Sequence, residues 1–313
     1  MHALSHNLRL PLFQAPMFLQ SGPAMVIAAC KAGIVGSFPT PNARTTEELA
    51  DWLKEITAAV DAETDAAWAM NLMMHRSNSR RFDDLALAVE YQAPLVISAL
   101  GSPREAVAEV HAYGGKIYAD VINPLFARKA LDAGVDGLVL VAAGAGGHTG
   151  PMSGFAFVEE VRQFWDGDLV LGGGISSGRA IRAAEVLGAT YAYMGTRFIA
   201  TVESMADQRY KQMVVDANGM DIVCSDSVTG VNANWLRASL EQAGFDPDNM
   251  PPPVAIDVIK SVGDSKRWKD IWAAGQGVAA THDILPIATL VDQLVTEYRA
   301  AVQQAISQQE DSP

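Results

Sequence analysis

A histidine enclosed by glycines is the clearest candidate for chemistry in this sequence. His148 follows Gly144-Ala145-Gly146-Gly147, and an apolar run from Leu138 to Ala143 comes directly before them. Such a run is typical of a strand buried on both faces of a parallel sheet, and α/β enzymes place catalytic groups at the carboxyl ends of such strands. A lone histidine more often ends a strand and bonds to backbone, but the surrounding glycines favour an active site. His148 is therefore a candidate active-site residue, and a histidine can change charge near neutral pH because its ordinary pKa is about 6.5.

Two further glycine-rich segments follow the last two predicted strands. Gly172-Gly173-Gly174 comes after one apolar run and Gly195-Thr196 after the next. Phosphate sites in (β/α)8 barrels are often built from the loops after strands seven and eight, where backbone N–H groups and a helix N-terminus face the anion. The glycine spacing of a dinucleotide fold and the lysine of a P-loop do not occur in the sequence. Together with His148, this indicates a mononucleotide cofactor, and NAD(P)H, if used, would act as a substrate.

Asp120 ends another predicted strand, so its carboxyl group should face the same mouth as His148. It could orient the imidazole, raise the pKa of the imidazole through its negative charge, or act as a base itself. An equally good interpretation is that Asp120 caps the helix that begins near Pro124. The two cysteines, Cys30 and Cys224, lie far apart without metal-ligand spacing, so we expect neither a disulfide framework nor a metal site.

The elements that must position these residues alternate between strand and helix. Eight apolar runs are typical of strands, and each is followed by a helix or by a connection long enough for one. These runs cover residues 12–17, 33–38, 68–72, 94–100, 116–121, 136–142, 169–172 and 190–194. The clearest helix covers residues 45–60, where Thr45 and Glu48 form a capping box. The pattern predicts an α/β protein with a (β/α)8 TIM barrel, and a doubly wound open sheet is the alternative.

The alternation ends after Thr201. Residues 202–281 contain several turn dipeptides, the run Pro251-Pro252-Pro253 and helical pieces at 210–217, 233–242 and 254–262. The following segment, 285–305, has the apolar periodicity of a long amphipathic helix. We therefore expect a barrel that binds the cofactor, made of residues 1–201 plus 282–313. Residues 202–281 are expected to be a small, mainly helical inserted domain that acts as a lid over the substrate.

The charge and composition of the chain limit the kinds of molecule that it can bind. The 313 residues have a formal net charge of −13, which argues against nucleic acid and anionic membranes as partners. No run is long and apolar enough to cross a bilayer, and residues 1–11 lack the pattern of a secretory signal. We expect a cytoplasmic protein that acts on a small-molecule substrate.

Several motifs together resemble the nitronate monooxygenase (2-nitropropane dioxygenase) family of FMN enzymes. They are Gln14-Ala15-Pro16-Met17, Asn71-Leu72, Ala145-Gly146-Gly147-His148, Gly172-Gly173-Gly174-Ile175, Met194-Gly195-Thr196-Arg197-Phe198 and Ala274-Gly275-Gln276-Gly277. They occur in the family's order along the whole chain. The resemblance implies FMN at the carboxyl-terminal face of a TIM barrel, beneath a small helical domain, with His148 as general base. It implies FMN contacts from Ala15, Pro16, Met17, Asn71, Gly146, Gly147, Gly173, Gly174, Met194, Gly195, Thr196 and Gln276.

The sequence departs from the family pattern beside His148. Gly144 stands where the family usually has glutamate, Thr149 where it has arginine, and Val141 where a glutamine often reaches the flavin. The resemblance implies an FMN-dependent oxidoreductase, with a nitronate monooxygenase-like oxygenase that uses O2 as the leading interpretation. Two alternatives stay open: an NAD(P)H-dependent FMN reductase of quinones or enoyl thioesters, and a flavin-binding protein without catalysis. A homodimer is expected from the family alone.

Overall fold

The computed structural model describes residue 4 and residues 6–253 and 270–310. The helix expected over 254–262 therefore lies outside the described residues. Eight parallel strands form one sheet whose neighbours follow the order β1-β9-β8-β6-β5-β4-β3-β2. They are β1 (Leu12–Gln14), β2 (Gly36–Pro39), β3 (Trp68–Met73), β4 (Leu95–Ala99), β5 (Lys116–Val121), β6 (Gly137–Val141), β8 (Asp168–Gly172) and β9 (Tyr191–Met194).

The two edges of this sheet meet and close a barrel. Phe13 of β1 pairs in parallel with Val35, which directly precedes β2. The N–H of Gln14 donates to the carbonyl of Val35 at 2.8 Å, and the N–H of Val35 donates to the carbonyl of Leu12 at 3.0 Å. Closure leaves no free sheet edge, so the prediction of a (β/α)8 barrel is confirmed and the open-sheet alternative is excluded.

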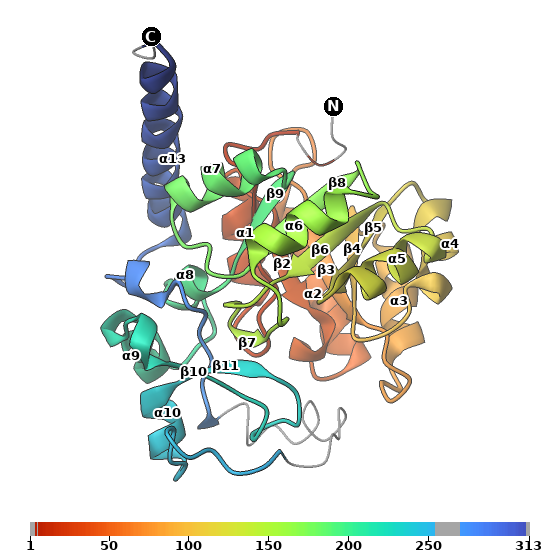
Figure 1. Ribbon diagram of the computed structural model, residues 1–313. Coiled ribbons are helices and arrows are strands. Elements are labelled where there is room, and N and C mark those ends of the chain that lie inside the picture. Colours follow the sequence, from red (N-terminus) through yellow and green to blue (C-terminus); the bar gives the residue numbers. More distant parts are fainter. Residues whose placement is uncertain (1–3, 5, 254–269, 311–313) are drawn as a thin grey trace.

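Helices follow the strands around the outside of the barrel (Figure 1). They are α1 (Pro23–Lys31), α2 (Thr46–Ala59), α3 (Arg81–Glu90), α4 (Arg104–Ala112), α5 (Pro124–Ala133), α6 (Gly154–Arg162), α7 (Gly178–Leu187), α8 (Thr196–Ile199) and α13 (Ile287–Glu310), with the short 3-10 turn η1 (Thr40–Asn42) after β2. The Thr45 side chain accepts a hydrogen bond from the N–H of Glu48, as the capping prediction required. The Glu48 carboxylate, however, accepts from the N–H of Arg44 rather than from that of Thr45.

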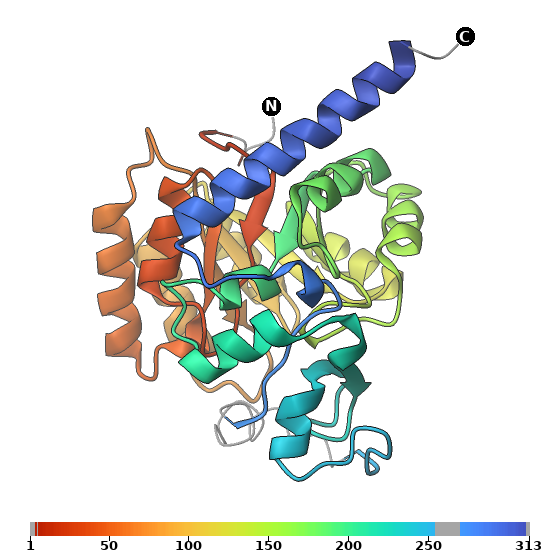
Figure 2. The same cartoon turned by 90° about the vertical axis from the view of Figure 1, so that its left-hand side faces the viewer.

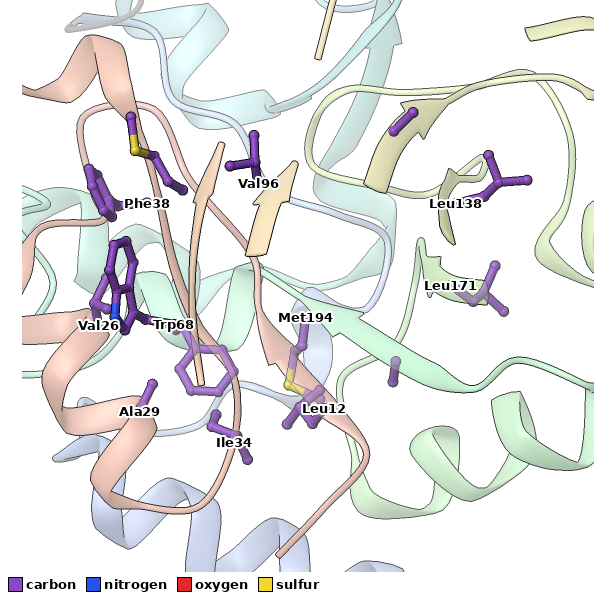
Figure 3. Close-up of a cluster of buried hydrophobic side chains, with 14 of the residues drawn as sticks. Leu12, Val26, Ala29, Ile34, Phe38, Trp68, Val96, Leu138, Leu171 and Met194 are labelled. Atoms are coloured by element: carbon purple, nitrogen blue, oxygen red, sulfur yellow. The ribbon is translucent and has the colours of Figure 1, made fainter. Parts of the chain in front are cut away.

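Alternating side chains of the strands separate two cores. Residues that face into the barrel form one cluster, with one member from nearly every strand, such as Phe13, Ile97, Tyr118, Val139 and Val170. Residues that face outward pack against the helices in a larger cluster, part of which Figure 3 shows. Full burial of one such aliphatic side chain contributes about 1.5–3 kcal/mol, so the period-two pattern fixes which residues face the barrel axis.

Residues 202–281 leave the barrel and return beside their starting point. Thr201 pairs in parallel with Leu285, so the two ends of the segment lie side by side. The segment contains α9 (Gln208–Asp216), α10 (Arg237–Gln242) and the 3-10 turns η2 (Gly219–Asp221) and η3 (Val278–Ala280). It also contains the strands β10 (Ile222–Ser225) and β11 (Ala233–Leu236). The helix expected over 233–242 is therefore wrong in its first four residues, because Ala233–Leu236 pairs with β10 and only the remainder is helical.

A three-stranded sheet joins this insertion to the barrel. Its order is β10-β11-β7, and β7 is the two-residue strand Gly147–His148 from the loop after β6. Figures 1 and 2 place the insertion at the same end of the barrel as β7, while the far end of α13 projects beyond the opposite end. Among the described helices, none combines the length and the apolar character needed to span a membrane.

Candidate active site

A cavity of about 780 Å³ opens at the carboxyl ends of the barrel strands. This volume lies within the usual range for small-molecule sites. Most residues that the sequence singled out line it, and they come from the carboxyl-terminal parts of six barrel strands and from the loops that follow them. They are Ala15, Pro16, Met17, Asn71, Asp120, Gly146, Gly147, His148, Gly173, Gly174, Gly195 and Thr196.

Two expected contact residues do not line the cavity. The side chain of Met194 is fully buried in the outer core, because strand alternation turns its neighbour Tyr193 inward instead. Gln276 packs against the loop before His148, where its N–H donates to the carbonyl of Gly144 at 2.9 Å. Its side-chain oxygen would lie 2.9 Å from a Cβ atom built on Gly144.

The loops after β8 and β9 leave open space beside the cavity wall. Gly174 has a φ of +71°, which disfavours any other residue, and no atom lies within 4 Å of a Cβ atom built on it. A Cβ atom on Gly195 would meet only ordinary contacts, the nearest being the Met17 sulfur at 3.5 Å. Behind these loops, the buried Arg197 guanidinium donates to the carbonyl of Ser176 at 3.0 Å. Its positive charge favours an anion at this wall, and the negative charges of Glu297 and Asp283 also act on it.

Gly146 also lies at a close approach between two backbone segments. A Cβ atom on Gly146 would lie 2.7 Å from the backbone nitrogen of Gly275. The glycine is therefore required by the close approach of the returning chain of the insertion. Its backbone still lines the cavity.

His148 is held at the cavity by backbone pairing. In β7 it pairs with Ala233 of β11, and Gly147 pairs with Asn234. The amide group of Asn234 donates to the carbonyl of Ala145 at 2.7 Å, which fixes the glycine loop from the same side. Burial lowers the pKa of the imidazole below its ordinary value of 6.5, because the protonated form loses hydration. His148 is therefore neutral at physiological pH and able to accept a proton.

Asp120 faces the cavity from β5. Its Oδ2 accepts a hydrogen bond from the Asn71 amide at 3.1 Å. Burial raises the pKa of the Asp120 carboxyl group from 3.8 to about 7, against the opposing effect of that hydrogen bond. The helix-capping alternative is wrong, since the Asn123 side chain caps α5 by accepting from the N–H of Phe126. Among the described hydrogen bonds and ion pairs, none joins Asp120 to His148, so the structure gives no support for Asp120 as the group that orients the imidazole.

Tyr193 is a cavity residue that the sequence did not indicate. It lies in β9 between Ala192 and Met194 and pairs with Gly172 of β8. Burial raises the pKa of its hydroxyl group well above the usual 10, and the negative charge of Asp120 adds to this effect. A tyrosine inside an apolar strand is usually interpreted as a core residue. Nothing in the sequence indicated that Tyr193 and Asp120 face the same cavity.

The insertion supplies the other wall of the cavity. Tyr210, Ile271 and Trp272 line it. The rings of Tyr210 and Trp272 stack with centroids 5.0 Å apart and an angle of 8° between their planes. The Tyr210 hydroxyl donates to the carbonyl of Ala273 at 2.5 Å. This part of the cavity is apolar and aromatic, which suits a flat or uncharged ligand.

A family model for nitronate monooxygenase matches residues 2–297 of this chain. The chain belongs to the nitronate monooxygenase family. Membership makes it an oxidoreductase that uses a flavin. A nitronate monooxygenase of Paraburkholderia phytofirmans (strain DSM 17436 / LMG 22146 / PsJN) is 28% identical, over 94% of this chain and 93% of the relative.

Solved structures show the same fold. A nitroalkane oxidase from Streptomyces ansochromogenes superposes with a TM-score of 0.82 at 23% identity and covers 97% of this chain and 99% of its own. FabK from Thermotoga maritima superposes with a TM-score of 0.81 at 23% identity and covers 97% of each chain. These two structures therefore share the barrel fold with this chain over nearly its whole length.

The cavity of this nitronate monooxygenase family member fits a flavin. It combines an open wall at Gly174 and Gly195, apolar space for a flat ring, and buried polar groups at its base. In the part of the chain that the structure describes, no three His, Cys, Asp or Glu side chains gather in a way that could hold a metal ion.

Proposed function

We propose that this chain is an FMN-dependent oxidoreductase of the nitronate monooxygenase type, in which His148 takes a proton from a carbon acid. One observation carries the proposal. The two phosphate-compatible glycine loops and the neutral imidazole of His148 open into the same cavity. A phosphate and a proton acceptor at one site are what a flavin mononucleotide enzyme acting on a carbon acid requires.

The FMN phosphate is proposed to bind at Gly174 and at Gly195-Thr196. The open space at both glycines lets a phosphate approach the backbone, and the charge of Arg197 lies behind the same loops. The flavin ring would extend from there across the base of the cavity, past Asn71 and beneath Ala15-Pro16-Met17. We favour FMN over a dinucleotide because the open space at Gly174 and Gly195 lies at one wall of the cavity, where it would serve one phosphate group.

His148 would act as the general base. Its neutral form accepts a proton from a carbon that a neighbouring nitro or carbonyl group has made acidic. Pairing of β7 with β11 holds the imidazole in place, and burial keeps it unprotonated. FMN, when bound, supplies the acceptor for the substrate's electrons. The insertion, with Trp272 and Ile271, would exclude water and contact the substrate, which is the lid role proposed for residues 202–281.

A second candidate is a reductase in which NAD(P)H reduces the flavin and a quinone or an enoyl thioester receives the electrons. The surroundings of His148 favour this candidate. Thr149, which replaces the family's usual arginine, is buried and donates to the carbonyl of Ala142 at 3.0 Å. Val141, which replaces a glutamine, gives the cavity an apolar wall. Neither residue therefore offers a free polar group to the cavity in place of the family's arginine and glutamine.

The two candidates are separated by the first half-reaction. The FMN-loaded protein would be mixed under anaerobic conditions with a neutral nitroalkane, 1-nitropropane, in one experiment and with NADH in another, while loss of the flavin absorbance is followed. The leading proposal expects bleaching by the nitroalkane and not by NADH. Bleaching by NADH alone would replace it with the reductase. A protein that binds no FMN would contradict both.

A further inference from the structure

Two buried polar atoms at the base of the cavity have no hydrogen-bond partner among the described residues. They are Oδ1 of Asp120 and the hydroxyl oxygen of Tyr193. Both residues line the cavity, and Asn71 occupies only the second carboxyl oxygen of Asp120, at 3.1 Å. Buried polar groups in folded proteins are nearly always paired, so two unpaired ones facing one cavity indicate a ligand with complementary polar atoms.

Strand alternation explains why these groups lie together. Asn71, Asp120 and Tyr193 are inward-facing residues of β3, β5 and β9, near the ends that open into the cavity. The layer below them inside the barrel is apolar or aromatic and includes Ile97, Val139 and Val170. We name Asn71, Asp120 and Tyr193 the polar floor. Nothing beneath the polar floor can supply the missing partners, so they must come from the cavity side.

The other ionisable groups of the cavity are distributed around the polar floor. Among the described lining residues they are Lys129 from α5, His148 from β7 and Tyr210 from α9. The neighbours of Asp120 on β6 and β4 are apolar, with Val139 directly paired to it. The charge of Asp120 acts on Tyr193, which places the two groups in one electrostatic environment.

The anchor of the proposed cofactor determines which ligand meets the polar floor. Tyr193 precedes Gly195 by two residues at the same strand end, so a flavin whose phosphate bound at Gly195, as proposed above, could reach Tyr193 with its ring. His148 and the insertion approach the cavity from β7 and β11, outside the barrel strands. In this arrangement the ring would lie toward the polar floor and the substrate toward His148.

We propose that Asp120 and Tyr193 donate hydrogen bonds to the flavin ring and thereby favour its reduced form, with Asp120 doing so only while it is protonated. This inference rests on the proposed FMN function. Reduction adds two electrons to FMN, and uptake of one proton leaves one negative charge on the ring. Hydroxyl donors aimed at the developing charge stabilise it, and a carboxylate in the same place opposes it.

The direction of the pH effect follows from Asp120. Its pKa is raised to about 7, so below that pH the carboxyl group is neutral and can donate a hydrogen bond. Above that pH it is a carboxylate that accepts from Asn71 and repels the reduced ring. The affinity for reduced FMN, relative to oxidised FMN, should therefore fall as the pH rises through about 7.

The test measures dissociation constants of oxidised and dithionite-reduced FMN for the full-length apoprotein from pH 5.5 to 8.5. Tyr193→Phe should weaken binding of reduced FMN relative to oxidised FMN by roughly 10- to 100-fold at every pH, the effect of one hydrogen bond to a charged group. Asp120→Asn keeps a hydrogen-bond donor but cannot ionise. It should remove the additional fall in relative affinity that the parent shows through about pH 7.

Tyr191→Phe is the matched control, since Tyr191 precedes Tyr193 by two residues on β9 and packs on Phe13 at 5.3 Å inside the barrel, outside the lining of the large cavity. This control should leave both constants as in the parent. Equal ratios for the parent, Tyr193→Phe and Asp120→Asn would overturn the inference while FMN binding itself survives. Absence of FMN binding to the parent would instead overturn the proposed function on which the inference rests.

Discussion

At the scale of single residues, the neutral imidazole of His148 sets the expected pH dependence. Its pKa is lowered by burial, so the base is protonated, and the reaction slowed, only below the ordinary value of 6.5. With a neutral nitroalkane as substrate, kcat/KM should rise with pH, pass half its maximum below 6.5 and then stay level. His148→Ala should lower this rate by about 10²–10⁴-fold and leave flavin content unchanged.

The exposed His111, bound to Asp136 at 2.8 Å, provides the control variant His111→Ala, which should have the parent's profile. A half-maximal rate near pH 7 would instead match the raised pKa of Asp120. Together with full activity of His148→Ala, that result would transfer the role of base to Asp120.

A second prediction at this scale concerns the phosphate wall. Gly195 has a φ of −108°, which other residues adopt freely, and space for a Cβ atom. Gly195→Leu should therefore fold normally but fill the place proposed for the phosphate and yield protein without FMN. Gly219→Leu, at an exposed glycine with its nearest neighbour 3.8 Å away, should keep the flavin. Stoichiometric FMN in purified Gly195→Leu, measured by absorbance, would place the phosphate elsewhere.

The sequence indicated most of the residues that line the cavity but could not assign side-chain directions. It indicated Met194, whereas its neighbour Tyr193 faces the cavity. Because side chains alternate along a strand, only one of Tyr193 and Met194 can face the barrel axis. Both side chains are large, and both fit either the inner or the outer core. Similarly, the glycine pattern around Gly146 signalled close approach, and only the fold shows that the approaching atom belongs to Gly275.

At the scale of elements, the strands were predictable and the sheet that holds His148 was not. Barrel strands are buried on both faces and therefore need long apolar runs, so such runs between predicted helices identify them. The strand β7 has two residues and pairs with β11 more than eighty positions later. Neither has a periodic signal of its own, since β11 is too short for alternation to distinguish it from the helix that follows.

This small sheet gives a prediction about the insertion. Asn234→Ala removes the hydrogen bond to the carbonyl of Ala145 and leaves that carbonyl unpaired, at a cost of about 1–3 kcal/mol. Because the bond fixes the His148 loop and not the phosphate loops, turnover should fall while FMN affinity changes little. Asn249→Ala, an exposed asparagine of the same insertion bound to Asp246, is the control. Loss of FMN from Asn234→Ala, measured by fluorescence titration, would show that the insertion holds the cofactor as well.

At the scale of the whole molecule, the C-terminal helix α13 packs beside the first strand of the barrel. The sequence predicted this helix after the insertion, and α13 packs against α7 with the Tyr298 hydroxyl 2.6 Å from the Glu185 carboxylate. Arg9, near β1, forms an ion pair with Asp292 of the same helix at 2.7 Å. Arg9 and α13, which are far apart in the sequence, thus lie on one side of the barrel, as Figure 2 shows for α13. The contacts of α13 support the barrel and do not form part of the cavity lining.

The contact between α7 and α13 gives the last prediction. Gly178 begins α7, and a Cβ atom there would lie 2.3 Å from the carbonyl oxygen of Leu294 and from the backbone nitrogen of Tyr298. Backbone atoms of a helix cannot move aside singly, so Gly178→Ala should displace α13 and lower the free energy of unfolding by about 1–3 kcal/mol or more. Gly154→Ala changes the equivalent first residue of α6, where the new atom would meet only the flexible end of Leu171 at 3.3 Å. Thermal unfolding of both variants followed by circular dichroism should show a lower midpoint for Gly178→Ala alone, and equal midpoints would mean that the close contact between α7 and α13 does not stabilise the fold.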